Sequence, residues 1–143
     1  MSKVEDCINN LATHVTSIAE LVDRAHPVYT PEKLVRMIKG VQGPQVGIVY
    51  EGMTANPEPG ATKRSITKTA HFGLYMAVES TALSDNVEGE IPAILLLDKI
   101  GVAVEGKVSP TGHPWEFMSE GYSDSFPDKA LWVQRWSTRV IGR

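Results

Sequence analysis

Residues 65–79 of the chain read SITKTAHFGLYMAVE, and apolar and mostly polar side chains alternate through this stretch. One face of an extended chain would carry Ala70, Phe72, Leu74, Met76 and Val78. The opposite face would carry Thr67, Thr69, His71 and Tyr75. A period of two residues with a single apolar face predicts a long β-strand that lies against a core on one side.

Three neighbouring stretches predict partner strands. Residues 45–53 are rich in β-branched residues, and a loop with Asn56, Pro57, Pro59 and Gly60 leads from them into the long strand. This arrangement predicts an antiparallel hairpin. Residues 115–120 predict a short strand. The stretch from Leu131 to Ile141 predicts a final strand that carries on one face Trp132, Gln134, Trp136, Thr138 and Val140.

Helical spacing appears in three other segments. Apolar residues recur every three or four positions over residues 3–24, at Val4, Ile8, Leu11, Val15, Ile18 and Val22, and Pro27 would end this helix. A shorter helix begins at Pro31 with Thr30 as its cap and closes at Lys39-Gly40. A third helix over residues 90–105 is apolar nearly all round, so we expect it deep in the core.

The predicted order is therefore α-α-β-β-α-β-β. Strands in pairs around an interior helix favour an α+β fold, with a mostly antiparallel sheet packed against helices. A length of 143 residues fits a single domain spanning residues 1–143.

Composition narrows the functional classes. Seventeen acidic and fourteen basic residues give a net charge of −3, which argues against specific nucleic-acid binding. We expect no membrane partner, because no run of about 18 apolar residues occurs. The single cysteine, Cys7, cannot form an internal disulfide and indicates a reducing compartment.

Motifs for catalysis are missing. The histidines at positions 14, 26, 71 and 113 do not have the four-residue spacing that places two metal ligands on one helix face. No Gly-x-Ser-x-Gly elbow and no phosphate-binding loop occur. Pro127-Asp128 could open a nuclease signature, but the acid-x-Lys that should follow is absent. We therefore predict no catalytic, cofactor-binding or metal-binding residue, and not an enzyme; a small nuclease or hydrolase stays the less favoured alternative.

Two features favour interaction with other proteins. The tryptophans Trp115, Trp132 and Trp136 lie close together in sequence with Phe117, Tyr122 and Phe126. Core filling is the favoured interpretation of these aromatics, although one or two of them could anchor an interface. Residues 79–128 hold ten acids and two lysines, a balance of −8 that leaves +5 for the rest of the chain. Two solvated faces explain this simply, and head-to-tail self-association is the alternative. The interface candidates are Lys63, Arg64, Arg135, Arg139, Trp115 and Trp136.

Several of these stretches also resemble one family. They are the apolar stripe from Val4 to Val22, VGIVYEGM at 46–53, FGLYM at 72–76, ILLLDKI at 94–100, HPWEF at 113–117 and LWVQRW at 131–136. Together, from Val4 to Val140, they resemble small tail-completion proteins of tailed bacteriophages, in particular a Mu-like family of tail terminators among the minor tail proteins.

The resemblance implies a structural protein of the virion tail that assembles in the host cytoplasm. Such proteins form hexameric rings on the head-proximal end of the tail tube, stop its polymerisation and offer a docking surface to the head. The implied partners are other copies of the chain, the tail tube protein and head–tail connector proteins, with no cofactor. Another head–tail joining or minor tail protein is the alternative within this class.

Overall fold

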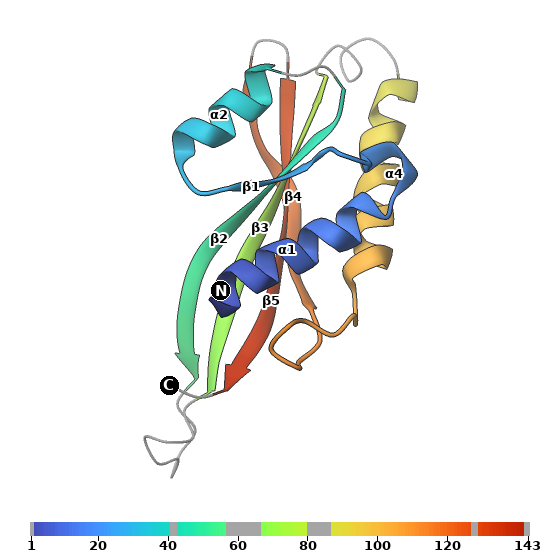
Figure 1. Cartoon of the computed structure of the whole chain (residues 1–143). Coiled ribbons are helices and arrows are strands. Elements are labelled where there is room, and N and C mark those ends of the chain that lie inside the picture. Colours follow the sequence, from blue (N-terminus) through green and yellow to red (C-terminus); the bar gives the residue numbers. More distant parts are fainter. Residues whose placement is uncertain (1, 41–42, 57–66, 80–86, 127–128, 142–143) are drawn as a thin grey trace.

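A computed structural model of the chain describes residues 2–40, 43–56, 67–79, 87–126 and 129–141 (Figure 1). Its helices and strands confirm the predicted α+β class and the predicted order, with one additional short strand. In chain order they are α1 (Lys3–Thr16), η1 (Ala19–Leu21), β1 (Ala25–Val28), α2 (Pro31–Gly40), β2 (Gln45–Asn56), β3 (Thr67–Glu79), α4 (Val87–Val104), β4 (Glu116–Phe126) and β5 (Lys129–Ile141).

The five strands form one twisted sheet in the order β1-β2-β3-β5-β4. The hairpin of β2 and β3 is antiparallel as predicted, with Ile48 opposite Leu74. β3 also pairs antiparallel with β5, which pairs antiparallel with β4. β1 runs parallel to β2, so the sheet is mixed. The long strand predicted from residues 65–79 therefore lies at its centre.

The main core lies between one face of the sheet and the helices α1 and α4. The predicted apolar face of β3 is buried throughout, from Ala70 to Val78, and it packs against the α1 residues Ile8, Leu11 and Val15. Trp115 joins this core from the start of β4: its ring meets Phe72 edge-on at 5.4 Å, and its indole Nε1 donates to Asn10 Oδ1 over 2.8 Å. The core thereby fixes α1 across the sheet.

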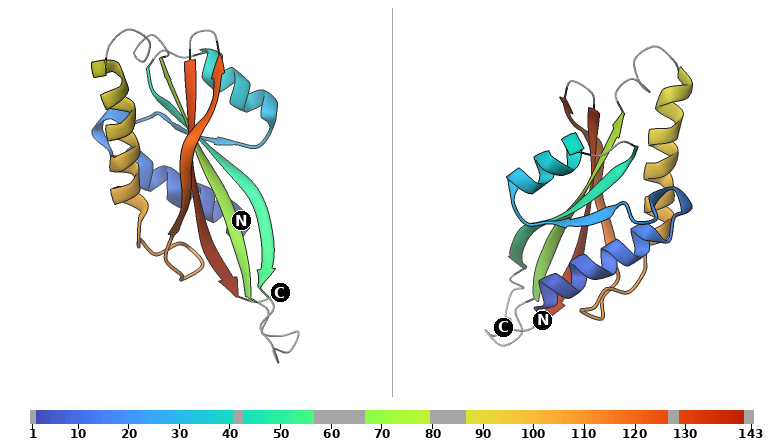
Figure 2. Two further views of the ribbon diagram at one scale, coloured as in Figure 1. Left: turned by 180° about the vertical axis from the view of Figure 1, so that it is seen from behind. Right: turned by 45° about the horizontal axis from the view of Figure 1, so that its top comes forward.

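A second, smaller core lies on the opposite face, under α2. Met37 and Ile38 pack there with Val28, Ala77 and Leu131. The close approach of α2 depends on Gly47, because a Cβ at this position would lie 2.9 Å from a Val28 methyl carbon and 3.1 Å from the Met37 sulfur. In the upper half of the strands, α2 and α4 consequently stand on opposite sides (Figures 1 and 2).

The predicted first helix over residues 3–24 is wrong beyond Thr16. The hydroxyls of Thr13, Thr16 and Ser17 donate to main-chain carbonyls of the preceding turn, and such bonds compete with continuation of a helix. The chain then turns through Asp23, at a φ of 61°, and residues 25–28 pair with β2. Pro27 is tolerated there because β1 is an edge strand.

The prediction that the third helix lies deep in the core is also wrong. Its inner side is buried through Ala93, Leu96, Leu97, Ile100 and Val104. Its outer side is open to solvent, since Ile94 and Leu95 are each 50% exposed and Val102 is 79% exposed. The fold provides one sheet face and α1 to cover α4, and its far side stays uncovered.

Candidate protein-binding surface

The outer side of α4 forms an apolar ridge between two open grooves. The ridge includes Asp98 and Val102, which line both grooves, and Leu95, which lines one of them. With its exposed neighbour Ile94, the ridge presents three large aliphatic side chains to solvent. A group of large apolar side chains exposed together commonly marks a protein-binding site.

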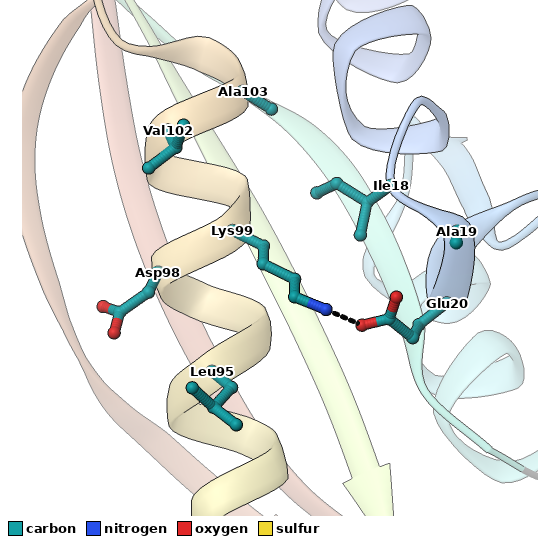
Figure 3. A pocket seen from close by; sticks show the side chains of 8 residues that line it. All are labelled: Ile18, Ala19, Glu20, Leu95, Asp98, Lys99, Val102 and Ala103. Atoms are coloured by element: carbon teal, nitrogen blue, oxygen red, sulfur yellow. Dashed lines mark hydrogen bonds and ion pairs between the residues drawn. The ribbon is translucent and has the colours of Figure 1, made fainter.

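One groove separates the ridge from η1 and has a volume of about 530 Å³ (Figure 3). Ile18, Ala19 and Ala103 provide its apolar wall. Lys99 crosses it to form an ion pair with Glu20, and Asp98 points away from that pair. The hydrogen bond from Lys99 lowers the pKa of the Glu20 carboxyl.

The other groove lies between α4 and β4 and has a volume of about 690 Å³; we call it the α4–β4 groove. Its apolar lining consists of Leu97, Gly101, Val102, Phe117 and Trp136. Its charged lining is acidic and consists of Asp98, Glu105 and Glu120. No described residue that lines this groove is basic. The groove can therefore receive a surface that is apolar in part and positively charged.

Gln134 of β5 holds the floor of this groove together. Its Nε2 donates to the Leu97 carbonyl of α4 over 3.0 Å and to Glu120 Oε1 of β4 over 2.8 Å. Its Oε1 accepts from Trp136 Nε1 over 2.8 Å. A buried amide with donors and an acceptor all engaged fixes the spacing of three elements.

The strand β4 itself is the long open edge of the sheet. In the described part of the chain no strand pairs with its outer side, while three apolar side chains along it, Phe117, Met118 and Tyr122, are about half exposed. Two irregularities in the register, at Met118 and near Ser123, interrupt its edge. Such bulges discourage uncontrolled strand pairing. The opposite edge, β1, has only four residues and includes Pro27.

The six predicted interface residues are not brought together. Trp115 and Trp136 are 1% and 0% exposed, so both fill the core, and neither offers side-chain surface to a partner. Trp136 contributes only as the floor beneath Phe117, which meets it edge-on at 5.5 Å. Lys63 and Arg64 lie outside the described residues.

Arg135 and Arg139 are exposed on β5, on the sheet face that α2 covers in part. Arg135 already has partners within the subunit. Its Nε donates to Glu51 Oε1 over 3.1 Å in an ion pair, and its Nη2 donates to the Tyr75 hydroxyl over 3.4 Å. The Tyr75 hydroxyl also donates to Glu51 Oε2 over 2.6 Å, and burial together with this bond raises the Tyr75 pKa. Arg139 is thus the cleaner probe of the two for an intermolecular contact.

Of the residues that form the exposed apolar surface, the sequence indicated only Phe117, as one of the clustered aromatics. It did not single out Ile94, Leu95 and Val102 of α4. The signal was present, since the helix is apolar on all sides, but it was interpreted as complete burial. In addition, His14 is half-buried and its Nε2 lacks a hydrogen-bond partner among the described residues. Burial, and secondarily Lys107, lowers the His14 pKa.

Cys7 provides a direct check of the α1 packing. Burial, and then the charge of Asp6, raises the pKa of its thiol to about 11 from an ordinary 9.0. At pH 8 the native protein should react with a disulfide reagent such as DTNB at least about 100-fold more slowly than the urea-unfolded chain, because the thiolate is the reacting form. Equal rates in the two states would show that the amino-terminal half of α1 is open.

The fold and the surface together define the class as an α+β protein with an exposed apolar helix and an open sheet edge. In comparisons with models of known protein families and with curated proteins, the sequence has no match. None of the described helices is long and apolar enough to cross a membrane. The described residues also contain no group of three His, Cys, Asp or Glu side chains placed to hold a metal ion.

Proposed function

We propose that this protein is a structural virion protein that caps the head-proximal end of a phage tail tube, ends its polymerisation and provides the docking surface for the head. The working form is a ring of copies of the chain, a hexamer by the resemblance. Its partners are the tail tube protein on one side and head–tail connector proteins on the other. It acts without catalysis, first in the host cytoplasm and then in the virion tail.

One observation carries the proposal beyond the resemblance: the exposed apolar surface over α4 and β4. Burying large aliphatic and aromatic side chains is favourable by about 1.5–3 kcal/mol each, so a chain that leaves several half exposed gains from covering them. The open edge of β4 lies beside them. Both features suit a subunit that is completed by neighbouring subunits.

The test is electron microscopy of tail tubes assembled with and without this protein, using the tail tube protein of the same virus. We expect tubes of limited length with a ring at one end. Uncapped tubes that grow to the same length in the presence of the protein would refute the proposal. Binding instead to a purified head connector, without tube binding, would favour the alternative of a head–tail joining protein.

A pair of matched variants connects this assay to the structure. Val102 and Val108 are both highly exposed valines, but only Val102 lies on the α4 ridge. Val102→Lys should abolish capping at subunit concentrations where Val108→Lys still caps, while both keep the unfolding free energy within about 0.5 kcal/mol of the original. Lysine is also tolerated near the C-terminus of a helix. Equal capping by both variants would exclude the ridge from assembly.

A further inference from the structure

The helix α2 carries a cluster of exposed cations. Lys33, Arg36 and Lys39 lie on its solvent side with a single acid, Glu32, and a partly exposed Val35. Its apolar residues Leu34, Met37 and Ile38 face the sheet and are already used in the second core. Lys33 lies 5.6 Å from the ring centre of Tyr29, and neither Arg36 nor Lys39 forms an ion pair with a described residue. Charge on the outer side of α2 is therefore available to a partner.

The α4–β4 groove has the complementary character. Three acids, Asp98, Glu105 and Glu120, line it. Of the three lining acids, only Glu120 accepts a hydrogen bond from a described residue, the one from the Gln134 amide. The nearby Lys99 extends to the other side of α4, where it pairs with Glu20 (Figure 3). The acids of the groove thus lack a cation within the described part of the subunit.

The two surfaces cannot meet within one subunit. α2 packs against β1 and β2, at one end of the strand order and on one face of the sheet. The groove lies at the other end of the order, beside β4, and on the opposite face. In a two-fold dimer, both contacts would have to face the same partner at once. Surfaces that point away from each other instead join each subunit to two neighbours, which produces a ring or a filament.

We propose that α2 of one copy docks along the α4–β4 groove of the next copy. This inference rests on the ring assembly of the proposed function and identifies the surfaces that form it. The ten residues of α2 span about 15 Å, close to the length of groove bordered by Leu97–Glu105 of α4. Arg36 and Lys39 meet Asp98 and Glu105, while Val35 meets the apolar lining at Val102 and Phe117.

Charge exchange tests the pairing with the full chain alone. Mass is measured by light scattering over a wide range of concentration at low salt, where charge pairing is strongest. The original chain should grow beyond 15.6 kDa as concentration rises. Arg36→Glu/Lys39→Glu and, separately, Asp98→Lys/Glu105→Lys should remain monomeric. The chain carrying all four changes should associate again. Lys3→Glu/Lys68→Glu lowers the net charge by the same amount as Arg36→Glu/Lys39→Glu but at other sites, and it should associate like the original.

Cysteine cross-linking tests the head-to-tail geometry. The native Cys7 does not interfere, because it is buried with a raised pKa. A chain with both Val35→Cys and Val102→Cys should form, on mild oxidation, a ladder of dimers, trimers and larger species. Chains with only one of the changes should form no ladder, yet mixing the two single variants should yield cross-linked dimers.

The outcomes separate this inference from the proposed function. An original chain that stays monomeric at every concentration, a failure of the fourfold variant to associate, or cross-linking that stops at dimers overturns the docking of α2. If reversed-charge variants still cap tubes, the inference is wrong and the tail function stands. If charge exchange restores association and the ladder forms, but tube ends remain bare, the inference stands and the tail function is wrong.

Discussion

Replacement of Trp136 by alanine should lower the free energy of unfolding by about 3–5 kcal/mol, the usual cost of truncating a buried aromatic side chain. The side chain is fully buried in the main core, packs under Phe117 and donates its indole hydrogen bond to Gln134. Alanine would leave a cavity beneath the α4–β4 groove and an unsatisfied amide oxygen. Because a domain of this size is stable by only about 5–15 kcal/mol, at least about a fifth of the total would be lost.

Urea unfolding followed by circular dichroism measures this change directly, and thermal unfolding should shift down by about 10 °C. The matched control is Phe117→Ala, which removes the ring on the other side of the same contact. Since Phe117 is about half exposed, its loss should cost roughly 1 kcal/mol and reduce association more than stability. Native stability of Trp136→Ala together with lost assembly would contradict the core assignment and support an interface role for Trp136.

The sequence predicted those parts of the fold that have a single buried face. β3 alternates with a period of two because one of its faces is buried against the main core, while His71 and Tyr75 on the other face are only partly buried, so the pattern records the burial. β1 has no such pattern. It is four residues long and contains Pro27, and it is a strand only because its main chain pairs with that of β2. Pairing of that kind is determined by tertiary structure and has no local signal.

The end of α1 and the burial of α4 were predicted less well than the strands, for two different reasons. Ile18 continues the spacing of α1, and it is buried, but it reaches the core from the turn before η1. The spacing therefore predicted correctly that Ile18 is buried, but wrongly that it belongs to the helix. In α4 the apolar residues exceed the area that the sheet and α1 can cover. Composition alone could not tell which side would be left exposed.

Charge was the one signal that located part of the surface. The acidic stretch over residues 79–128 predicted a negative region, and the fold gathers three of its acids in the α4–β4 groove, at Asp98, Glu105 and Glu120. The sequence placed cationic interface candidates at Arg135 and Arg139. The structure shows a second set of exposed cations on α2, where three of them are close enough in sequence to share one helix face.

Replacement of Gln134 by glutamate should be the most damaging isosteric change in the groove. At neutral pH the new carboxylate cannot donate to the Leu97 carbonyl, and it would lie about as close to the Glu120 carboxylate as the amide does now, 2.8 Å. The part-buried like-charge contact, and the repulsion between the new carboxylate and the Leu97 carbonyl oxygen that the amide now contacts at 3.0 Å, each cost on the order of 1–3 kcal/mol. We expect a loss of roughly 3 kcal/mol or more at pH 8, measured by urea unfolding.

The loss should depend on pH in a defined direction. Repulsion and burial raise the pKa of the carboxyl pair in the folded variant above its value in the unfolded chain. A raised folded-state pKa gives stability that is present at low pH and lost as pH rises through that value. The gap between variant and original should accordingly shrink between pH 8 and pH 5. A gap that is constant over this range would show that the pair does not share a proton.

Glu120→Gln supplies the control and the rescue. Alone, it should cost less than about 1 kcal/mol, because the Gln134 amide can still donate to an amide oxygen at this exposed position. Combined with Gln134→Glu it should recover a large part of the lost stability, since the introduced amide can donate to the new carboxylate and the like-charge contact is gone. Recovery should remain incomplete, because the Leu97 carbonyl still lacks the donor that Gln134 supplied. A double variant no more stable than Gln134→Glu alone would mean that Gln134 acts on α4 only and does not connect it to β4.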